Sequence, residues 1–374
     1  MRHSYPEGKS ATFKLPALAL AFTMAVITSS FYAASAAAED SGNKYVEFSQ
    51  VGDPAEVLEV KDAVPQALQP GEIRVDVLAS PIHPSNLLQI SGNYGTAAKL
   101  PSTPGSEGIG RVTEVSSDVS IISVGDLVLL TVGGTWRDEI VAPAKAFIPL
   151  PGLEVEDPRL IEQLSMTVIN PLTAHLMLSN FVELNEGDWI VQSAANSAVG
   201  GYLVQLAKVR GIKTVNVVRR EGLAEDLMAK GATVVLIDGP DLAERIAIAT
   251  EQQPVVLAVD AVGGETFSRL ATSLAKEGTL VTYGVMSGQP ATFNPALSIF
   301  NDLTIRGFWL SKWFETSSLQ EKQAALGRVV PRIASGQLKA NIDSRFSVSE
   351  IKQAVTRAGE RGRNGKVLIV PDHE

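Results

Sequence analysis

Two adjacent arginines, Arg219 and Arg220, stand where a nucleotide-binding unit carries its specificity residue. They follow a β-branched run, and a turn of small residues precedes that run at residues 193–201. Sites for NAD usually place Asp or Glu here, roughly 20 residues after the turn, to bond the ribose 2′-hydroxyl. Arginine cannot accept that hydrogen bond, but it can neutralise a 2′-phosphate. The pair therefore favours NADPH over NADH, and solvated surface charges are the alternative interpretation.

The segment that would position these arginines has the order strand, turn, helix, strand. Apolar residues 189–192 suit a buried parallel strand, residues 202–209 have helical apolar spacing, and residues 214–218 form a second strand. A pyrophosphate would lie on the N–H groups at the helix N-terminus. The GxGxxG pattern is incomplete because residues 196–200 keep only the last glycine. By itself the pattern therefore leaves a βαβ unit with a merely tight turn open.

Composition excludes several classes of site and partner. A length of 374 residues suggests two domains. The formal net charge of −9 argues against nucleic acid as a main partner. The chain has no cysteine, which removes disulfides, thiolate catalysis and cysteine-ligated zinc. Its four histidines include His3 and His373 at the chain ends, and the other two, His83 and His175, cannot build a zinc site alone.

Residues 1–38 are predicted to be a signal-like presequence rather than part of the fold. Arg2, Lys9 and Lys14 precede an uncharged run over residues 15–38 that ends in small residues. This pattern favours a secretory signal that is cleaved after Ala36 or Ala38. A retained membrane anchor is the second interpretation, and an organellar presequence is a weaker third because Arg2 is its one arginine. A working signal implies an exported or periplasmic protein, and otherwise the protein is cytoplasmic.

The remaining chain predicts an α/β fold with two kinds of pattern. Short alternating strands at residues 73–79, 108–115 and 126–132 indicate a barrel-like, β-rich domain. From residue 170 to 308, strands alternate with helices, which predicts a doubly wound parallel sheet of the Rossmann type. Later strands of that sheet are predicted at residues 233–237, 255–260 and 279–283. The end of the chain has an amphipathic helix at 318–335 and a strand at 365–370.

Several short motifs, in their order along the chain, resemble those of the medium-chain dehydrogenase/reductase superfamily. Within it they look like the NADPH-dependent trans-2-enoyl thioester reductases, the mitochondrial enoyl-CoA/enoyl-ACP reductase family. The resemblance covers nearly everything after residue 44. The motifs are Ile82-His83-Pro84-Ser85-Asn86, Gly92-Asn93-Tyr94-Gly95, Gly134-Thr135-Trp136-Arg137, Asn170-Pro171, Asn216-Val217-Val218-Arg219, Val281-Thr282-Tyr283-Gly284 and Gly307-Phe308-Trp309-Leu310.

The resemblance implies a domain organisation and a partner. A GroES-like catalytic domain would comprise residues 44–169 and 311–374, and a Rossmann domain would comprise residues 170–310. The strand predicted at residues 303–306 often pairs across a dimer in this superfamily, which implies a homodimer. The membrane would be contacted only through an uncleaved presequence.

The resemblance also implies a reaction. Reducing a C=C bond beside a thioester needs a hydride at the β-carbon, a proton at the α-carbon and donors to the enolate-like oxygen. Tyr94 matches the proton-donor tyrosine of the family, and a phenol offers a positioned O–H near neutral pH. A tyrosine that only fills the wall of a cleft is the alternative. No metal is required.

By resemblance, a set of residues would bind NADPH. Asn170 would lie near the nicotinamide ribose or carboxamide, and Lys366 would approach the cofactor near the chain end. A turn before Pro171 and a solvated strand terminus are the structural alternatives for these two, as is a core position for Trp309. The predicted cofactor-binding residues are Asn170, Asn196, Ser197, Ala198, Val199, Arg219, Arg220, Tyr283, Gly284, Val285, Met286, Phe308, Trp309, Leu310 and Lys366.

Two positions differ from related patterns. Zinc alcohol dehydrogenases carry a ligand histidine in a Gly-His-Glu motif, but this chain has Gly105-Ser106-Glu107. His83 stands where the family usually has Asn, and it is interpreted as a surface or loop histidine.

Two other functions remain open at this stage. One is a zinc-independent NADPH quinone oxidoreductase or alkene reductase, and the other is a non-catalytic NADPH-binding protein. Acyl carriers and NADPH are intracellular, which conflicts with the predicted export.

Overall fold

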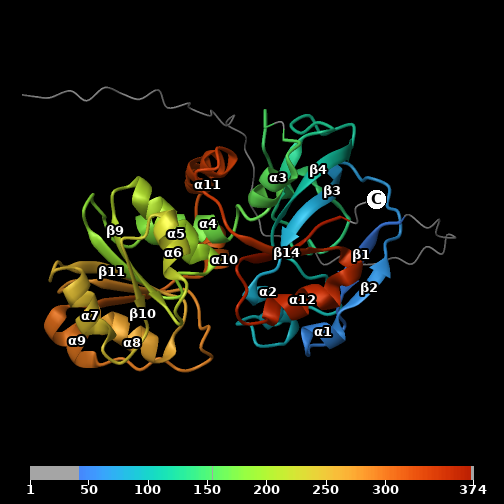
Figure 1. Ribbon diagram of the computed structural model, residues 1–374. Helices are drawn as coiled ribbons and strands as arrows, with labels where there is room; N and C mark the ends of the chain where they lie inside the picture. The colour runs from blue at the N-terminus through green and yellow to red at the C-terminus, as the bar shows by residue number, and fades with distance from the viewer. Residues whose placement is uncertain (1–41, 154, 372–374) are drawn as a thin grey trace, which may run out of the picture.

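The computed structural model describes residues 42–153 and 155–371. The predicted presequence, residues 1–38, lies outside these described residues. The described chain forms two units built on separate sheets, and Figure 1 shows them side by side. The blue and cyan early elements share one unit with the red α12 and β14, while the yellow-green to orange segment forms the other.

The first unit is a seven-stranded, largely antiparallel sheet. Its strands run in the order β14–β15–β3–β4–β5–β7, and β6 also pairs with β3. The predicted alternation over residues 73–79 is present, because Ile73, Val75 and Val77 are all buried on one face. The strands are β3 (Glu72–Pro81), β4 (Gly108–Val115), β5 (Leu127–Leu130), β6 (Glu139–Pro143), β7 (Phe147–Pro149), β14 (Ile342–Phe346) and β15 (Lys366–Ile369).

Smaller elements cover this sheet. A two-stranded antiparallel ribbon joins β1 (Lys44–Glu47) to β2 (Glu59–Asp62). The helices are α1 (Pro54–Val57), α2 (Pro84–Ile90), α3 (Pro158–Leu164) and α12 (Ile351–Gly359), with short 3-10 turns at Ala144–Ala146 and Val348–Glu350. The chain therefore returns to this unit after completing the other one.

The second unit is a six-stranded parallel sheet in the order β10–β9–β8–β11–β12–β13. This order reverses between β8 and β11, as in a doubly wound fold. The strands are β8 (Trp189–Gln192), β9 (Lys213–Val218), β10 (Val234–Ile237), β11 (Val255–Asp260), β12 (Thr279–Thr282) and β13 (Thr304–Gly307). Its helices are α5 (Ala198–Val209), α6 (Ala224–Lys230), α7 (Leu242–Ala249), α8 (Gly264–Ser273) and α9 (Pro295–Asn301).

Alternate residues of the central strands face opposite helix layers. Ile190 and Leu257 pack with Leu203 of α5, whereas Val191 packs with Leu270 of α8. Three further helices complete the chain, namely α4 (Asn170–Ser179), α10 (Leu310–Thr316) and α11 (Leu319–Ala334). The same core that contains α5 also contains residues of β4, β5 and α4, so that the two units share one hydrophobic cluster. Among the described helices, none has both the length and the apolarity needed to span a bilayer.

The predicted α/β fold is confirmed, and several predicted strand bounds match the structure residue for residue. These are 108–115, 189–192 and 255–260. The helix predicted at 202–209 begins earlier, at Ala198, because the side chain of Ser197 caps it by accepting from the Gly200 N–H at 3.1 Å. The helix predicted at 318–335 is α11, which begins with a capping box between Ser318 and Glu321.

Two neighbouring glycines of α5 test how tightly the βα turn is packed. A Cβ at Gly200 would lie 2.5 Å from the Ala195 carbonyl oxygen, but a Cβ at Gly201 would meet nothing nearer than Lys230 at 3.8 Å. We expect Gly200→Ala to lower the free energy of unfolding by about 1–3 kcal/mol through overpacking. Gly201→Ala is the control and should raise it by up to about 1 kcal/mol through helix propensity. Urea unfolding would measure both, and equal effects would contradict the close approach.

Candidate active site

The turn between β8 and α5 is held by side chains from three strands. Gln192 donates to the Gly200 carbonyl oxygen at 3.1 Å and to Asn216 Oδ1 at 2.7 Å. Ser193 donates to Asp260 Oδ1 at 2.7 Å, which ties the carboxyl ends of β8 and β11 together. Ala194 adopts a φ of 48°, a left-handed value that a non-glycine residue rarely takes. The N-terminus of α5 is therefore presented at a fixed, tightly packed turn, where backbone N–H groups can bind an anion.

The predicted residues of this turn differ in exposure. Asn196 is exposed, Ser197 and Ala198 are half-buried, and Val199 is buried. At the end of β9, Arg219 and Arg220 are exposed, and neither makes an ion pair with any residue in the described part of the chain. The structure therefore leaves two cations free of acidic partners beside the anion-binding turn.

The other strands of the parallel sheet bring further predicted residues to the same edge. Tyr283 follows β12 and lies beside Ser197 and Asp260, and burial raises the pKa of its hydroxyl. Gly284 is half-buried, and the next two residues, Val285 and Met286, are exposed. Carboxyl ends of parallel strands meet at one edge of a sheet, which explains why segments distant in sequence gather here.

Tyr94 reaches this edge from the other unit. Its hydroxyl oxygen accepts a hydrogen bond from Trp309 Nε1 at 3.0 Å, although the two residues are 215 positions apart. Trp309 is 43% exposed, which excludes the interpretation as a core residue. On either side of it, Phe308 and Leu310 are half-buried. The Tyr94 oxygen accepts from the indole N–H, so the Tyr94 O–H can still donate to another group.

Asn170, the first residue of α4, is buried with an unsatisfied side chain. It is 6% exposed, and its Nδ2 has no hydrogen-bond partner among the described residues. Buried amide groups are almost always hydrogen-bonded, so an orphan amide donor indicates an acceptor supplied by a ligand or by water. The side chain therefore fits a binding role.

A buried triad is formed by Glu107, His83 and Lys366, and Glu107 contacts the backbone just before Asn170. Glu107 Oε1 is 2.7 Å from His83 Nε2, and Lys366 Nζ is 3.1 Å from His83 Nδ1. All three side chains are buried, at 0%, 2% and 6% exposed. The prediction that His83 is a surface or loop histidine is wrong, because two buried polar partners satisfy both of its ring nitrogens. Lys366 is likewise no solvated strand terminus.

Burial shifts the pKa values of all three groups. Burial raises the pKa of Glu107 to about 8, against hydrogen bonds from two backbone N–H groups and the charge of Lys366. It lowers the pKa of Lys366 to about 7, against the charge of Glu107. Burial and the charge of Lys366 hold the pKa of His83 well below its usual range, so that the imidazole is neutral.

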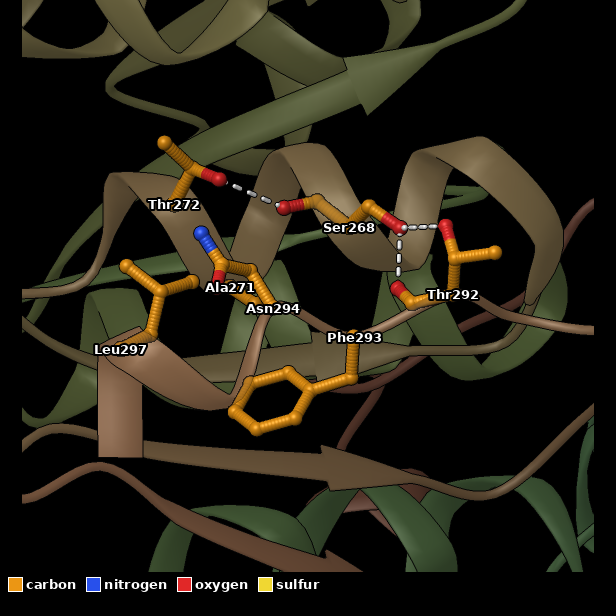
Figure 2. Close-up of a pocket in the computed structure, with 7 residues that line it drawn as sticks. All are labelled: Ser268, Ala271, Thr272, Thr292, Phe293, Asn294 and Leu297. Atoms are coloured by element: carbon orange, nitrogen blue, oxygen red, sulfur yellow. Dashed lines mark hydrogen bonds between the residues drawn. The ribbon is translucent and has the colours of Figure 1, made fainter. Parts of the chain in front are cut away.

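The other candidate sites lie elsewhere. Within the described ranges, no three His, Cys, Asp or Glu residues are grouped so as to hold a metal ion. His175 lies on α4, and burial together with the charges of Arg328, Arg210 and Arg332 lowers its pKa to about 4. A pocket of about 280 Å³ lies between α8 and the segment leading into α9. Figure 2 shows its lining residues, among which Ser268 contacts Thr292. None of the predicted site residues lines this pocket.

Sequence reasoning missed three members of this arrangement. Glu107 was considered only as part of a motif without a metal ligand, while Gln192 and Asp260 were considered only as the last residues of strands. The signal for Gln192 and Asp260 was a polar residue at the end of an apolar strand, since such residues lie at the edge where ligands bind. Glu107 precedes β4 and had no such signal.

Comparison with known proteins gives first the class. Residues 69–152 match the alcohol dehydrogenase GroES-like domain, and residues 198–325 match the zinc-binding dehydrogenase family. Together they define a medium-chain dehydrogenase/reductase. More particularly, the chain belongs to the mitochondrial enoyl-[acyl-carrier-protein] reductase family.

Two relatives show the extent of the match. The enzyme of Rattus norvegicus is 37% identical over 86% of this chain and 87% of its own. That of Dictyostelium discoideum is 36% identical over 88% of this chain and 95% of its own.

Solved structures agree with this assignment and include a second activity. A mitochondrial 2-enoyl thioester reductase heterodimer from Candida tropicalis has a TM-score of 0.78, with 30% identity over 88% of this chain and 99% of its own. A complex of Etr1p with NADP and crotonyl-CoA has a TM-score of 0.79 and 30% identity over the same shares. A quinone oxidoreductase from Pseudomonas syringae has a TM-score of 0.76, with 26% identity over 88% of this chain and all of its own.

Proposed function

We propose that this protein is an NADPH-dependent reductase of the C=C bond of trans-2-enoyl thioesters, carried on CoA or an acyl carrier protein. The observation that carries the proposal is the contact between Tyr94 and Trp309 at the carboxyl edge of the parallel sheet. It unites a proton-donating hydroxyl with the nucleotide-binding unit, in a chain whose relatives are named enoyl reductases.

The described residues fit a dinucleotide with a 2′-phosphate. The backbone at Gly200 leaves no room for a Cβ. Among residues 42–153 and 155–371, the buried amide nitrogen of Asn170 has no hydrogen-bond partner, and Arg219 and Arg220 have no acidic partner. We assign the pyrophosphate to residues 196–199, the 2′-phosphate to the two arginines, and the nicotinamide end to Asn170 with residues 283–286 and 308–310. Lys366 remains among the proposed cofactor-binding residues, because His83 and Glu107 link it to the backbone just before Asn170. NADPH, when bound, supplies the hydride for the β-carbon.

Tyr94 is the proposed proton donor. Its O–H gives the proton to the α-carbon, and the Trp309 N–H stabilises the phenolate that results. The addition balances as one hydride and one proton across the double bond. The enolate-like thioester oxygen needs hydrogen-bond donors as well.

The presence of two separate sheets supports a division into two domains. We assign residues 44–169 and 311–374 to the catalytic domain and residues 170–310 to the cofactor domain.

Replacing Tyr94 tests the chemistry. We expect Tyr94→Phe to lower kcat for a short trans-2-enoyl-CoA by about 10²–10⁴-fold, since a positioned acid contributes that much. NADPH oxidation, followed in a chain without residues 1–38, would measure it. Tyr45→Phe is the matched control because Tyr45 lies in β1 and its ring contact with Arg137 needs no hydroxyl. Turnover of a simple quinone that ignores Tyr94, with no thioester turnover, would instead establish a quinone oxidoreductase.

Replacing both arginines tests the choice of cofactor. In an Arg219→Ala/Arg220→Ala variant, we expect KM for NADPH to rise about 10–100-fold, as for lost hydrogen bonds to a charged group. The KM for NADH should stay unchanged, because NADH has no 2′-phosphate. Steady-state kinetics with both cofactors would measure this. Equal changes for NADH and NADPH would show that the arginines do not read the phosphate.

We further propose that the mature protein is a homodimer joined along β13. All four residues of β13 are exposed, and among the described strands it pairs with β12 alone. Nearby Ile299 and Phe300 of α9 are 71% and 77% exposed. A free strand edge beside exposed apolar side chains favours pairing with a second copy.

We also propose that residues 1–38 are a targeting presequence, with a secretory signal as the type that the sequence fits best. Both of these proposals can be tested on protein purified from its own cells. N-terminal sequencing should begin after Ala36 or Ala38, and sedimentation should give a dimer that Ile305→Asp dissociates. An intact Met1, or a monomer at micromolar concentration, would contradict the respective proposal.

A further inference from the structure

We propose that His83 is a positioning residue of the active site, because its imidazole links Lys366 to Glu107 and thereby fixes the start of α4, where Asn170 lies. The inference rests on the proposed function, since it assigns Asn170 to the cofactor.

The first step is the anchoring of backbone by Glu107. Its Oε2 accepts from the N–H groups of Val168 and Ile169 at 2.7 Å and 2.8 Å. These two residues immediately precede Asn170, and α4 has no side-chain cap of its own. The carboxylate therefore takes the place of an N-cap and sets the position of the first helical residue.

The second step is the fixing of Glu107 itself. Its backbone carbonyl oxygen accepts hydrogen bonds from the hydroxyls of Ser80 and Thr135, at 2.8 Å and 3.0 Å. Its remaining carboxylate oxygen, Oε1, contacts His83 Nε2. The imidazole is thus the one side chain that completes the shell of this carboxyl group among the described contacts.

The third step is the link to Lys366. Lys366 Nζ donates to the Ile82 carbonyl oxygen at 2.8 Å and contacts His83 Nδ1. Two arrangements of protons satisfy every one of these contacts. In the first, the lysine ammonium donates to Nδ1, and Nε2–H donates to the carboxylate. In the second, the carboxylic acid donates to Nε2, and Nδ1–H donates to the neutral amine.

The two arrangements contain the same protons and have the same total charge. They differ by moving one proton from Lys366 to the ring and one from the ring to Glu107. Burial raises the pKa of Glu107 and lowers the pKa of Lys366, which favours the arrangement with a neutral acid and a neutral amine, whereas the attraction between the two charges favours the charged arrangement. Other ionisable groups facing this pair are Tyr202 of α5, beside Glu107, and Arg363, beside Lys366. An imidazole therefore keeps the anchor intact in either proton arrangement.

A shorter side chain breaks this link at one end. Asn at position 83 can replace Nδ1 as a partner of Lys366, but it cannot reach Glu107. Without Nε2, the Oε1 atom of Glu107 loses its hydrogen-bond partner. Protonation of the carboxylate is then favoured, and it weakens the hydrogen bonds from the two backbone N–H groups. Gln at position 83 places its amide nitrogen close to the position of Nε2 and keeps donation to Glu107.

The test is NADPH binding, measured by the fluorescence of the reduced nicotinamide across pH 6.5–8.5. We expect wild-type affinity to change little with pH. His83→Asn should weaken binding about tenfold at pH 7, as for one lost hydrogen bond to a charged group, and binding should improve as pH rises. His83→Gln should restore most of the affinity. His175→Asn, a histidine of α4 outside the triad, is the matched control.

A second variant keeps the test decisive if His83→Asn does not fold. Glu107→Gln mimics the protonated acid of the second arrangement, because its amide N–H can donate to His83 and its oxygen can accept from the two backbone N–H groups. We therefore expect binding close to that of the wild type that does not depend on pH, and a loss of binding would overturn the link through His83. Unchanged affinity in His83→Asn at every pH, or equal losses in the Asn and Gln variants, would overturn the role of His83 while leaving the proposed function intact. Failure of the wild-type chain to bind NADPH would overturn the proposed function itself.

Discussion

The arrangement depends on one buried carboxyl group. Glu107 is completely excluded from solvent, and an unpaired charge there would cost several kcal/mol. It contacts His83, at the start of α2, and the segment before α4, and His83 in turn contacts Lys366 of β15. Satisfying it therefore draws together three parts of the chain that are far apart in sequence. This need, more than any surface ion pair, explains why the first and last strands of the antiparallel sheet meet beside α4.

The cofactor edge is assembled by a different principle. Parallel strands place their carboxyl ends together, so one residue after each of several strands is enough to build a crevice. Ser193, Asp260 and Tyr283 follow this rule, and their mutual contacts tie three strands at the point where strand order reverses. The antiparallel unit then contributes Tyr94, whose partner Trp309 follows the last strand of the parallel sheet. Binding and proton donation are thus carried by separate units that meet at one contact.

The sequence predicted what depends on local pattern. Strands such as Val255–Asp260 are apolar runs bounded by turn residues, and their limits were predicted correctly because burial on both faces requires such runs. The start of α5 was missed because a cap depends on the geometry of Ser197, not on apolar spacing. His83 was assigned to the surface or a loop by residue type, since its burial depends in part on Lys366, which is 283 positions away. Likewise, nothing local indicates that the amide of Asn170 is buried and unpartnered.

The place of β15 has a consequence for biosynthesis. This strand lies between β14 and β3 in the sheet, and it also carries Lys366. The parallel unit is continuous from β8 to β13, so all of its strands have left the ribosome before β14 and β15 are made. Domains generally fold as units during synthesis. The antiparallel sheet, however, cannot close until β14 and β15 have been made, and β3 must remain without this neighbour until then. Completion of the triad therefore follows synthesis of the entire parallel unit.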